Sequence, residues 1–488
     1  MGPAVIDPRA VGWVLGQFFA ALAVAMLVPL GYAGVIGSGD TAALWPAVLW
    51  TSFAAAVLLL LSRARPARDL RQREGILLVV LVWVGACLFA ALPFYFSPYF
   101  ASFTDAFFES VSGFTTTGAT VLPDVEVLSR GIQFWRCFSH WLGGMGIVLL
   151  GVAILPLIGQ GGMHLYRAEF SGARSERLTP RIVESAKALW KIYLALTIAG
   201  FVALRLAGMD SFEALCHAFS ALGTGGFSTR TASIAAYESP LIEYIIIVLM
   251  LLGGASFILH YRLWIERRAV HVFTDYEFLS YLAVIAAASA IIAAVLVWHD
   301  GFSLEPGYRA ALFQVVSIVT TTGFITQDYA TWYPFCQLLL LALMFIGGCT
   351  GSTAGGLKVA RVGLLAQVVD REFRRMAEPQ GVFTIRLGGQ AIPEITIQSL
   401  LNLVYLAWLV NFIACLLLAA AGVDVLTAIS AVAACMFNVG PGLGAVGPIE
   451  NYGALPALAK WVLAGCMIAG RLEFYTLLVV LTSSFWRR

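Results

Sequence analysis

Ten apolar runs of membrane-spanning length recur along this 488-residue chain. A helix of about 20 residues crosses the roughly 30 Å hydrocarbon core of a bilayer. Inside that core no water is available to the backbone, so a spanning segment must be a helix or part of a closed barrel. The runs therefore predict an all-α polytopic membrane protein. They cover approximately residues 11–36, 42–62, 75–97, 132–158, 186–208, 240–264, 278–299, 333–369, 397–421 and 456–483, and the eighth is interrupted.

The composition excludes an ordinary soluble protein. Hydrophobic residues make up 60% of the chain and charged residues only 12%, which is far from the soluble averages. The eight cysteines include no Cys-x-x-Cys pair, so neither a zinc site nor a disulfide framework is indicated. Asp7 and Arg9 precede the first run without a small-residue cleavage site, which predicts a retained first span.

Four short glycine-centred segments form an internal repeat. They read TTGAT at 116–120, TGGFS at 224–228, TTGFI at 321–325 and NVGPG at 438–442. Aligned on the shared glycine, successive segments lie 108, 97 and 117 residues apart. Each follows a helix-like stretch that is too short to span, which predicts a re-entrant pore helix. These stretches cover residues 104–114, 211–222, 307–319 and 424–437.

Basic residues indicate the orientation of the chain, because Lys and Arg accumulate in cytoplasmic loops. Twenty-three of the 30 lie at the two ends or around and after the second, fourth, sixth and eighth runs. Both termini are therefore predicted to be cytoplasmic, and all four glycine segments enter from outside. The outer segments carry fourteen acidic residues against six basic ones, and a negative mouth concentrates cations.

The repeating unit is a span, a short helix, a glycine loop and a second span. Four pseudo-symmetric units around one axis would bring the loops together, so that backbone carbonyls replace the water around an ion. Glycine suits such a loop because it tolerates left-handed backbone angles and keeps side chains off the axis. The alternative is that the glycines only allow close helix packing. The predicted divisions are a two-helix extension at 1–70 and pore repeats at 71–165, 166–270, 271–390 and 391–488.

These loops, their spacing and the interrupted eighth run resemble the Trk/Ktr/HKT superfamily of potassium transporters, and the two extra N-terminal spans resemble its TrkH branch. The resemblance covers nearly the whole chain. It implies that each loop lines one quarter of a selectivity filter, that glycine at the shared position goes with potassium permeation, and that K+ is the transported ion. It also implies a location in the bacterial cytoplasmic membrane. The filter residues would be Thr116, Thr117, Gly118, Thr224, Gly225, Gly226, Thr321, Thr322, Gly323, Asn438, Val439 and Gly440.

The four loops differ from the filter of a potassium channel. None reads TVGYG, and only the central glycine is common to all of them. The sequence therefore predicts a shorter filter of moderate selectivity that also passes other large monovalent cations. Pro441 lacks an N–H group and stiffens the last loop, and we expect it to compensate for the threonines that are absent there.

The interruption of the eighth run is a ten-residue segment with five glycines. Such a segment cannot form a stable helix in its middle, and irregular backbone at membrane depth is tolerated where it lines a cavity or is covered by protein. This predicts an intramembrane loop beneath the filter, and the resemblance implies that the loop is the gate. A nucleotide phosphate loop is excluded because Gly356-Leu357-Lys358 replaces the required Gly-Lys-Ser/Thr, and a simple helix kink is the other alternative. The gate residues would be Gly347, Gly348, Cys349, Thr350, Gly351, Ser352, Thr353, Ala354, Gly355 and Gly356.

Arg471 stands near the middle of the tenth run. An arginine at that depth is costly unless it is paired or faces water, so it is a functional candidate. Glu473 is two positions away and points to another side of a helix, which makes it a poor direct partner. The resemblance to the Gly-Arg-Leu-Glu segment of the family implies that Arg471 holds the gate loop across the permeation path. A helix ion pair or a carbonyl-capping arginine is the alternative. Lys358 is expected at the inner interface.

Further polar and small side chains give weaker signals. His217 and Glu213 stand four apart on the second short helix, a spacing for a hydrogen-bonded pair or, less favoured, a metal site. Glu109 is interpreted as steering cations or stabilising the start of its helix. His140 and the tryptophans near it resemble interfacial anchors. The glycines of 143–146 are interpreted as a packing contact or a dimer contact.

These features favour an ion-conducting transporter without catalytic residues. A membrane-embedded enzyme would need clustered intramembrane Asp, His, Ser or Lys residues, and the sequence has neither an HExxH motif nor paired intramembrane aspartates. The inverted repeats of many secondary transporters do not fit, since every repeat here starts on the same side. Symport of potassium with H+ or Na+ on the same fold is the alternative.

Regulation is expected to come from a separate protein. The sequence shows no soluble nucleotide-binding domain, and its longest cytoplasmic loops are short and basic. The resemblance implies a cytosolic nucleotide-binding subunit of the TrkA type, docked on a homodimer in which each protomer has its own pore in the lipid bilayer. Neither an organic cofactor nor nucleic acid is expected as a partner.

Overall fold

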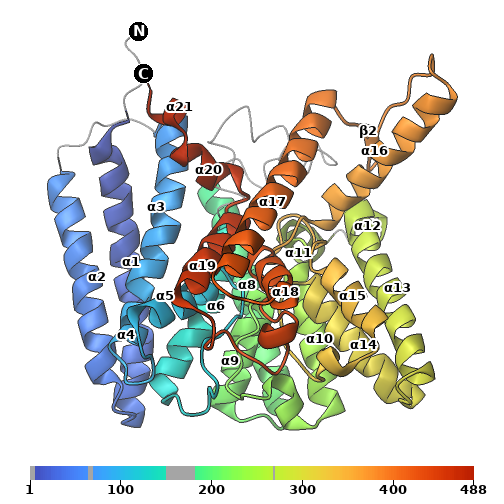
Figure 1. Cartoon of the computed structure of the whole chain (residues 1–488). Helices are drawn as coiled ribbons and strands as arrows, with labels where there is room; N and C mark the ends of the chain where they lie inside the picture. Colours follow the sequence, from blue (N-terminus) through green and yellow to red (C-terminus); the bar gives the residue numbers. More distant parts are fainter. Residues whose placement is uncertain (1–5, 64–69, 150–181, 268–269, 488) are drawn as a thin grey trace.

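The computed structural model describes residues 6–63, 70–149, 182–267 and 270–487, and it is almost entirely helical (Figure 1). Within these ranges the one sheet is an antiparallel hairpin of two-residue strands, β1 (Arg386–Leu387) and β2 (Gln390–Ala391). One large apolar core joins helices from the N-terminal extension to the last repeat. The prediction of an all-α membrane protein is confirmed.

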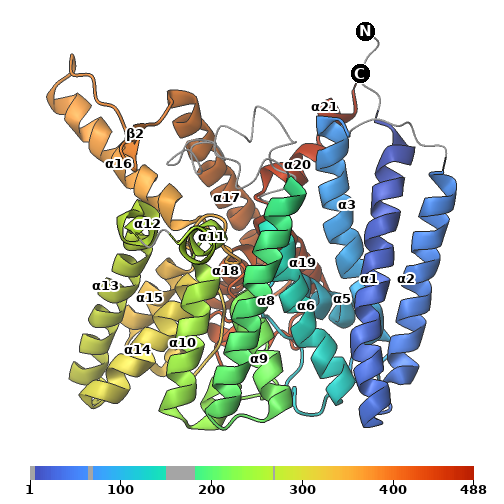
Figure 2. The same ribbon diagram turned by 180° about the vertical axis from the view of Figure 1, so that it is seen from behind.

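The N-terminal extension is a helical hairpin. α1 (Pro8–Ile36) begins with the Asp7 side chain as its cap and a proline at its first position. It ends at Gly37, whose φ of 66° lies in the left-handed region. α2 (Thr41–Leu61) returns antiparallel to α1, and both lie along one flank of the molecule beside α3 (Gln72–Ala90) (Figure 2).

Asp40 connects this hairpin to the first pore repeat. Its buried carboxylate accepts a hydrogen bond from the Gly131 amide at 2.8 Å and others from the hydroxyls of Ser38 and Ser129. Asp40→Ala should lower the free energy of unfolding by about 1–3 kcal/mol, because these donors lose a buried acceptor. Thermal unfolding of the detergent-purified protein measures the effect. Asp40→Asn keeps an acceptor oxygen and should lose clearly less, and equal losses would contradict the docking role of the carboxylate.

Four repeats follow the hairpin, each with a short pore helix between two other helices (Figure 1). The first comprises α3, α4 (Leu92–Tyr95), α5 (Phe103–Phe114) and α6 (Arg130–Leu149). The second comprises α8 (Ile182–Leu206), α9 (Ser211–Gly223), the 3-10 helix η3 (Ser233–Tyr237), α10 (Pro240–Gly254) and α11 (Phe257–Trp264). The third comprises α12 (Val270–Thr274), α13 (Tyr276–Trp298), α14 (Leu304–Val319), η4 (Tyr329–Thr331), α15 (Pro334–Leu343) and α16 (Val359–Ala377). The fourth comprises α17 (Glu394–Ala420), α18 (Val425–Met436), η5 (Gly444–Val446), α19 (Ala457–Arg471), α20 (Tyr475–Leu481) and α21 (Ser483–Trp486).

Six helical segments of the described residues are long and apolar enough to cross a membrane. They are α1, α2, α3 continued by α4, α8, α13 and α17, and each coincides with a predicted run. The fourth run is described only in part, because α6 ends at Leu149 and residues 150–158 lie outside the described ranges. The eighth run is interrupted after α15, as predicted.

Two predicted spans are bent, so the prediction of continuous spans over 240–264 and 456–483 is wrong. α10 and α11 meet at 99°, and α19 and α20 meet at 116°. The first bend has a clear cause at Gly253 and Gly254. The carbonyls of both residues accept amide hydrogens from the 347–356 segment instead of from a continuing helix.

The second bend follows Arg471 directly. Glu473 and Phe474 have left-handed φ values of 57° and 51° there, a conformation that costs a non-glycine residue about 1–2 kcal/mol. Hydropathy alone does not reveal this bend, because the two helices together are as apolar as a single span.

The pore helices are α5, α9, α14 and α18, and the predicted short stretches match them to within three residues at each end. The side chains of Ser102, Asp210 and Asp424 accept first-turn amides of α5, α9 and α18, which satisfies donors that a helix start leaves free. Each pore helix ends where a glycine loop begins. The negative end of each helix dipole therefore points to a glycine loop, which favours a cation there.

Candidate functional site

The four glycine loops share one backbone conformation. The first residue of each predicted filter triplet has a φ between 52° and 56°, and the glycine that ends the triplet has a φ between 80° and 100°. In each loop the middle residue donates its amide hydrogen to the carbonyl five residues earlier, at 2.8 or 2.9 Å. These bonds join Thr117 to Ser112, Gly225 to Ser220, Thr322 to Ser317 and Val439 to Ala434. Loops of different sequence are therefore structurally equivalent.

The loops close into a ring. A Cβ atom built on each shared glycine would lie within 2.5 Å of the carbonyl oxygen of the middle residue in the next loop. The order is Gly118 to Gly225, Gly226 to Thr322, Gly323 to Val439 and Gly440 back to Thr117. This cyclic approach leaves no room for any side chain at the four positions. The alternative that the glycines only allow helix packing therefore does not account for the geometry.

The first residue of each triplet places a buried side-chain oxygen at the inner end of its loop. The Thr224 hydroxyl donates to the Gly223 carbonyl, and the Thr321 hydroxyl accepts the Gly355 amide, both at 2.7 Å. Among the described residues, Thr116 Oγ1 and Asn438 Oδ1 have no hydrogen-bond partner. Two buried acceptor oxygens without donors suit a cation, since an unsatisfied buried acceptor is otherwise costly.

Asn438 also joins two quarters of the ring. Its amide nitrogen donates to Thr117 Oγ1 at 2.9 Å and to the Met467 carbonyl at 3.1 Å. The Met467 carbonyl can only accept, so the amide orientation of Asn438 follows from this bond. The asparagine in the fourth loop is therefore a cross-link to the first loop, in a position where the other three loops have threonine.

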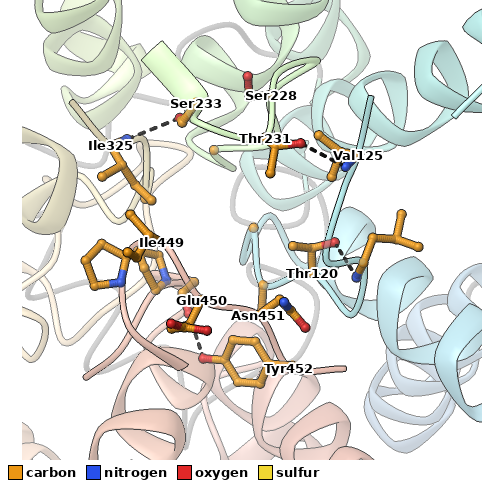
Figure 3. A pocket seen from close by; sticks show the side chains of 18 of the residues that line it. Thr120, Val125, Ser228, Thr231, Ser233, Ile325, Ile449, Glu450, Asn451 and Tyr452 are labelled. Carbon is orange, nitrogen blue, oxygen red and sulfur yellow. Dashed lines mark hydrogen bonds between the residues drawn. The ribbon is translucent and has the colours of Figure 1, made fainter. Parts of the chain in front are cut away.

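A vestibule lies above the ring and is lined by all four quarters (Figure 3). The Tyr452 hydroxyl donates to the Gly440 carbonyl at 2.7 Å, and the Ile325 amide donates to the Ser233 hydroxyl at 3.2 Å. Glu450 contributes a carboxylate to the lining. The vestibule leads from solvent to the glycines, because its lining includes Gly118, Gly226, Gly323 and Gly440.

The outer surface beside the vestibule contains acidic groups. Hydrogen bonds from the Thr231 hydroxyl and the Glu126 amide lower the pKa of Asp124, so its negative charge persists at lower pH than usual. Arg230 offsets part of the acidic character, since it pairs with Glu126 at 3.1 Å and with Glu213 at 2.8 Å. The mouth is therefore less negative than the count of acidic residues indicates.

The segment 347–356 is an irregular loop on the inner side of the ring. Gly347, Gly351 and Gly356 have φ values of 76°, 76° and 73°, which explains why glycine recurs here. A Cβ at Gly355 would contact the Phe437 carbonyl and the Asn438 side chain. The loop therefore lies directly against the ring, as the sequence predicts for an intramembrane loop.

Hydrogen bonds attach this loop to its neighbours. The Thr353 hydroxyl donates to the carbonyls of Leu222 and Gly253, at 2.9 and 3.0 Å. The Thr350 amide and hydroxyl donate to Glu277 Oε1, at 2.6 and 2.9 Å. Buried polar backbone in a membrane requires such partners, so these contacts stabilise the loop in its described position.

Thr353→Val should loosen the loop. The valine is similar in volume but removes the donor to two buried carbonyls, so one to two hydrogen bonds of about 1 kcal/mol each are lost. We expect cation flux into proteoliposomes to rise about fivefold for this reason. Ser352→Ala is the matched control, because the hydrogen bonds of the Ser352 hydroxyl to other described residues stay within the loop, to Cys349 and Ala354. Equal effects of the two variants would argue against anchoring by Thr353.

Arg471 lies at the end of α19 and is 3% exposed. Its Nη1 donates to the Thr353 carbonyl at 2.9 Å, and its Nη2 makes a long contact of 3.5 Å to the Gly143 carbonyl. No carboxylate of the described ranges pairs with its charge. Arg471 therefore contacts the loop through a carbonyl, and the ion-pair alternative does not apply.

Glu473 pairs with Arg361 of α16 at 3.0 Å, and not with Arg471, as the spacing predicts. Lys358 is half-buried, and its Nζ donates to the Ala354 carbonyl. The positive φ of 65° at Lys358 turns the chain at this point, and its place at the inner interface stays a prediction. Basic side chains from two different elements thus contact the loop.

The expected pair of His217 and Glu213 is not formed through their side chains. His217 Nδ1 bonds to the Glu213 carbonyl at 2.7 Å and its Nε2 to the Ser228 hydroxyl at 2.9 Å. The Glu213 carboxylate is occupied by Arg230 and Tyr237. No cluster of three His, Cys, Asp or Glu side chains that could hold a metal occurs in the described ranges.

Two further expectations are corrected by burial. Glu109 is fully buried and pairs with Arg136 at 2.6 Å, so it neither faces the entering ions nor stabilises a helix start. His140 is fully buried and stacks on Phe227 with 4.0 Å between ring centres, so it is no interfacial anchor. The packing interpretation of residues 143–146 is confirmed, since added Cβ atoms at the first two glycines would meet backbone atoms of α5 and α9.

The sequence did not predict several contacts of the site, chiefly Glu109 with Arg136 and Glu473 with Arg361. The one signal in the sequence was a charged residue inside an apolar run, which must be paired. The partners are 27 and 112 residues apart. Spacing on a single helix does not identify such partners.

The fold and this site define a polytopic membrane transporter made of four unequal copies of one span, pore helix, loop and span unit. The chain belongs to the TrkH family, because residues 46–487 match the family model, which is described as a cation transport protein. It is 41% identical over 482 residues to the Trk system potassium uptake protein TrkH of Escherichia coli K12, covering 98% of this chain and 99% of that protein. It is 42% identical over 486 residues to the TrkH protein of Vibrio parahaemolyticus, with the same coverage.

A solved structure supports the same assignment. The crystal structure of the potassium transporter TrkH from Vibrio parahaemolyticus superposes with a TM-score of 0.90 at 40% identity, covering 98% of this chain and 99% of that chain. These relatives are transporters, so the prediction that the chain is not an enzyme is confirmed.

Proposed function

We propose that this chain takes up potassium across the cytoplasmic membrane through a cation-selective pore. The observation that carries the proposal is the closed ring of glycine loops, in which each glycine faces a carbonyl of the next loop. Such a ring replaces part of the water around a monovalent cation, and four pore-helix ends add negative potential at the same place. The names of the relatives in Escherichia coli and Vibrio parahaemolyticus, both potassium uptake proteins, support potassium as the ion.

In this proposal the filter consists of the triplets 116–118, 224–226, 321–323 and 438–440. Carbonyl oxygens of the middle residues surround the ion, and the free oxygens of Thr116 and Asn438 add ligands at the inner end. Glycine in all four quarters favours potassium over sodium. Only one residue is common to the four triplets, which supports moderate selectivity.

The gate in this proposal is the loop 347–356 together with Arg471. A buried guanidinium that pairs with no carboxylate of the described residues repels a cation that leaves the ring, and its bond to Thr353 holds the loop in place. Opening of the gate therefore requires that the hydrogen bond from the Gly355 amide to the Thr321 hydroxyl break. The hydrogen bond from Arg471 to the Thr353 carbonyl must also break or shift.

The proposed assembly is a homodimer regulated by a cytosolic nucleotide-binding subunit of the TrkA type. α16 and the β1–β2 hairpin project beyond the helical bundle on the same side as α21 (Figure 1). The last turn of α16 contains Arg374 and Arg375, which supports a cytoplasmic position for that side. Both termini would then be cytoplasmic, in a chain divided at residues 70, 165, 270 and 390 as predicted.

Flux of potassium, rubidium and sodium into liposomes that contain the purified protein tests the proposal. We expect potassium and rubidium to enter down their own gradients, with sodium slower, at any constant pH. Potassium influx that requires an imposed proton or sodium gradient would instead support symport on the same fold. Protein that reconstitutes as a folded species and passes no potassium under either condition would refute the proposal.

A further inference from the structure

The residue nine positions before each filter glycine has the same place in all four pore helices. Glu109, His217, Gln314 and Ala431 occupy this position, and all four are 0% exposed. Three of the four are polar, although a buried position in a membrane protein favours apolar residues. Each polar side chain reaches the strand that leaves the filter on the outer side of the glycine. We call the residues that follow each filter glycine, such as Thr120 and Val121 in the first loop, the exit strand, although they are not part of a β-sheet.

In the first quarter, Glu109 binds the exit strand twice. Its carboxylate accepts the Thr120 hydroxyl at 2.9 Å and the Val121 amide at 3.0 Å. Thr120 is two residues after Gly118, so the contact restrains the loop immediately beyond the ring. The charge of Glu109 is balanced by Arg136 at 2.6 Å, since a buried carboxylate requires a partner.

Arg136 extends this contact to the second quarter. Its Nη1 donates to the Ser228 carbonyl at 2.9 Å, and its guanidinium lies 3.6 Å from the centre of the Phe227 ring. His140, one turn further along α6, stacks on the same Phe227 ring, with ring centres 4.0 Å apart. The exit strand of the second quarter is therefore held by α6 of the first repeat.

His217 completes the network from the second pore helix. The Glu213 carbonyl can only accept, so Nδ1 of His217 carries the hydrogen. In the neutral ring Nε2 is then an acceptor for the Ser228 hydroxyl, at 2.9 Å. A continuous series of contacts thus runs from Thr120 through Glu109, Arg136 and Ser228 to His217.

In the other two quarters the residue at this position makes no such link within the described ranges. Gln314 makes only long contacts, of 3.4 Å to the Thr326 hydroxyl and 3.5 Å to the Gln327 carbonyl. In the fourth quarter Ala431 has no polar group, and the neighbouring Ser430 instead bonds to Leu443, at 2.9 and 3.0 Å. The exit strands of these quarters are held by other residues, since the Ser317 hydroxyl donates to the Phe324 carbonyl at 2.7 Å and the Tyr329 hydroxyl to the Gly442 carbonyl at 3.2 Å.

We propose that Glu109, Arg136, Ser228 and His217 form a positioning network that holds two neighbouring filter loops at a fixed separation and thereby sets the discrimination between potassium and sodium. The network rests on the proposed filter and adds residues that do not touch the ion. A ring whose carbonyls are held apart fits potassium, the larger ion, and cannot contract around sodium, the smaller one. Loss of the network lets the first two loops move inward and coordinate sodium.

The sodium-to-potassium flux ratio in proteoliposomes is the measurement. His217→Leu removes the acceptor for Ser228 and should raise this ratio about twofold to tenfold, the range that corresponds to one buried hydrogen bond. Gln314→Leu is the matched control, with the same register and burial but only long contacts, and should leave the ratio unchanged. His217→Gln restores an acceptor with a residue that the chain itself uses at this position, and should return the ratio toward that of the unaltered protein.

The double variant Glu109→Gln with Arg136→Gln tests the link between the two quarters without leaving an unpaired buried charge. We expect it to fold, as judged by gel filtration and thermal unfolding, and to show the same rise in the sodium-to-potassium ratio. A folded double variant with an unaltered ratio would overturn the network. His217→Leu and Gln314→Leu with equal effects would overturn it as well. Unaltered protein without potassium-selective flux would instead refute the proposed function, so the two failures are distinguishable.

Discussion

Gly226→Ser should lower potassium flux into proteoliposomes by about tenfold or more and raise the sodium-to-potassium ratio. The φ of Gly226 is 80°, and a non-glycine residue pays about 1–2 kcal/mol for such a conformation. A Cβ at this position would also overlap the Thr322 carbonyl oxygen of the next loop. The serine must therefore displace a carbonyl of the ring. A change of about 1.4 kcal/mol in the barrier corresponds to roughly tenfold in rate.

Gly301→Ser separates the cost of the backbone conformation from the steric conflict with a neighbouring carbonyl. Gly301 has a φ of 71° but no heavy atom within 4 Å of a built Cβ, so the backbone cost is similar and the steric conflict is absent. We expect this variant to lose some stability and to keep its flux and ion preference. A Gly226→Ser protein that conducts and selects like the Gly301→Ser protein would remove Gly226 from the filter.

Arg471→Ala should raise potassium flux about tenfold or more in the absence of any regulatory subunit. The variant removes a buried positive charge on the inner side of the ring and the hydrogen bond to the Thr353 carbonyl. A hydrogen bond that involves a charged group contributes about 1.5–3 kcal/mol, which corresponds to roughly tenfold to a hundredfold in the population of an open loop. Flux measured with and without a potassium gradient records the effect.

Two variants make the arginine test specific. Arg471→Lys keeps the charge and should stay closer to the unaltered protein. Arg73→Ala removes another arginine that donates to backbone carbonyls, those of Phe485 and Arg487, at 3.0 and 2.8 Å. Arg73 lies beside the N-terminal hairpin, away from the ring, so its loss should leave the flux unchanged. Unaltered flux in Arg471→Ala would exclude a role of this residue in gating.

Much of the fold follows from local sequence pattern. The apolar runs predict α1, α2, α3, α8, α13 and α17, and the short stretches before the glycine loops predict α5, α9, α14 and α18. The glycines of the loops indicate positions without room for a side chain, which the ring geometry explains. These features depend on residues that are close neighbours in the chain, and hydropathy and backbone preference are local properties.

The bends were not predictable in the same way. α10 ends at Gly254 because amides of a segment about one hundred residues later bond to its last carbonyls. The apolar character continues on both sides of such a bend, so a window average shows a continuous span. Burial corrected the interpretations of Glu109 and His140 for a related reason, since exposure depends on which helices surround a residue.

The order of amino acids was enough to predict the number of repeats, the positions of the pore helices and the one residue type that each loop requires. Three features needed the folded chain: the order in which the loops contact one another, the partner of each buried charge, and the place of Arg471 against Thr353. This division reflects the range of the interactions. Helix formation and membrane insertion depend on nearby residues, whereas a buried charge or carbonyl is satisfied by whichever group the packing brings within hydrogen-bond distance.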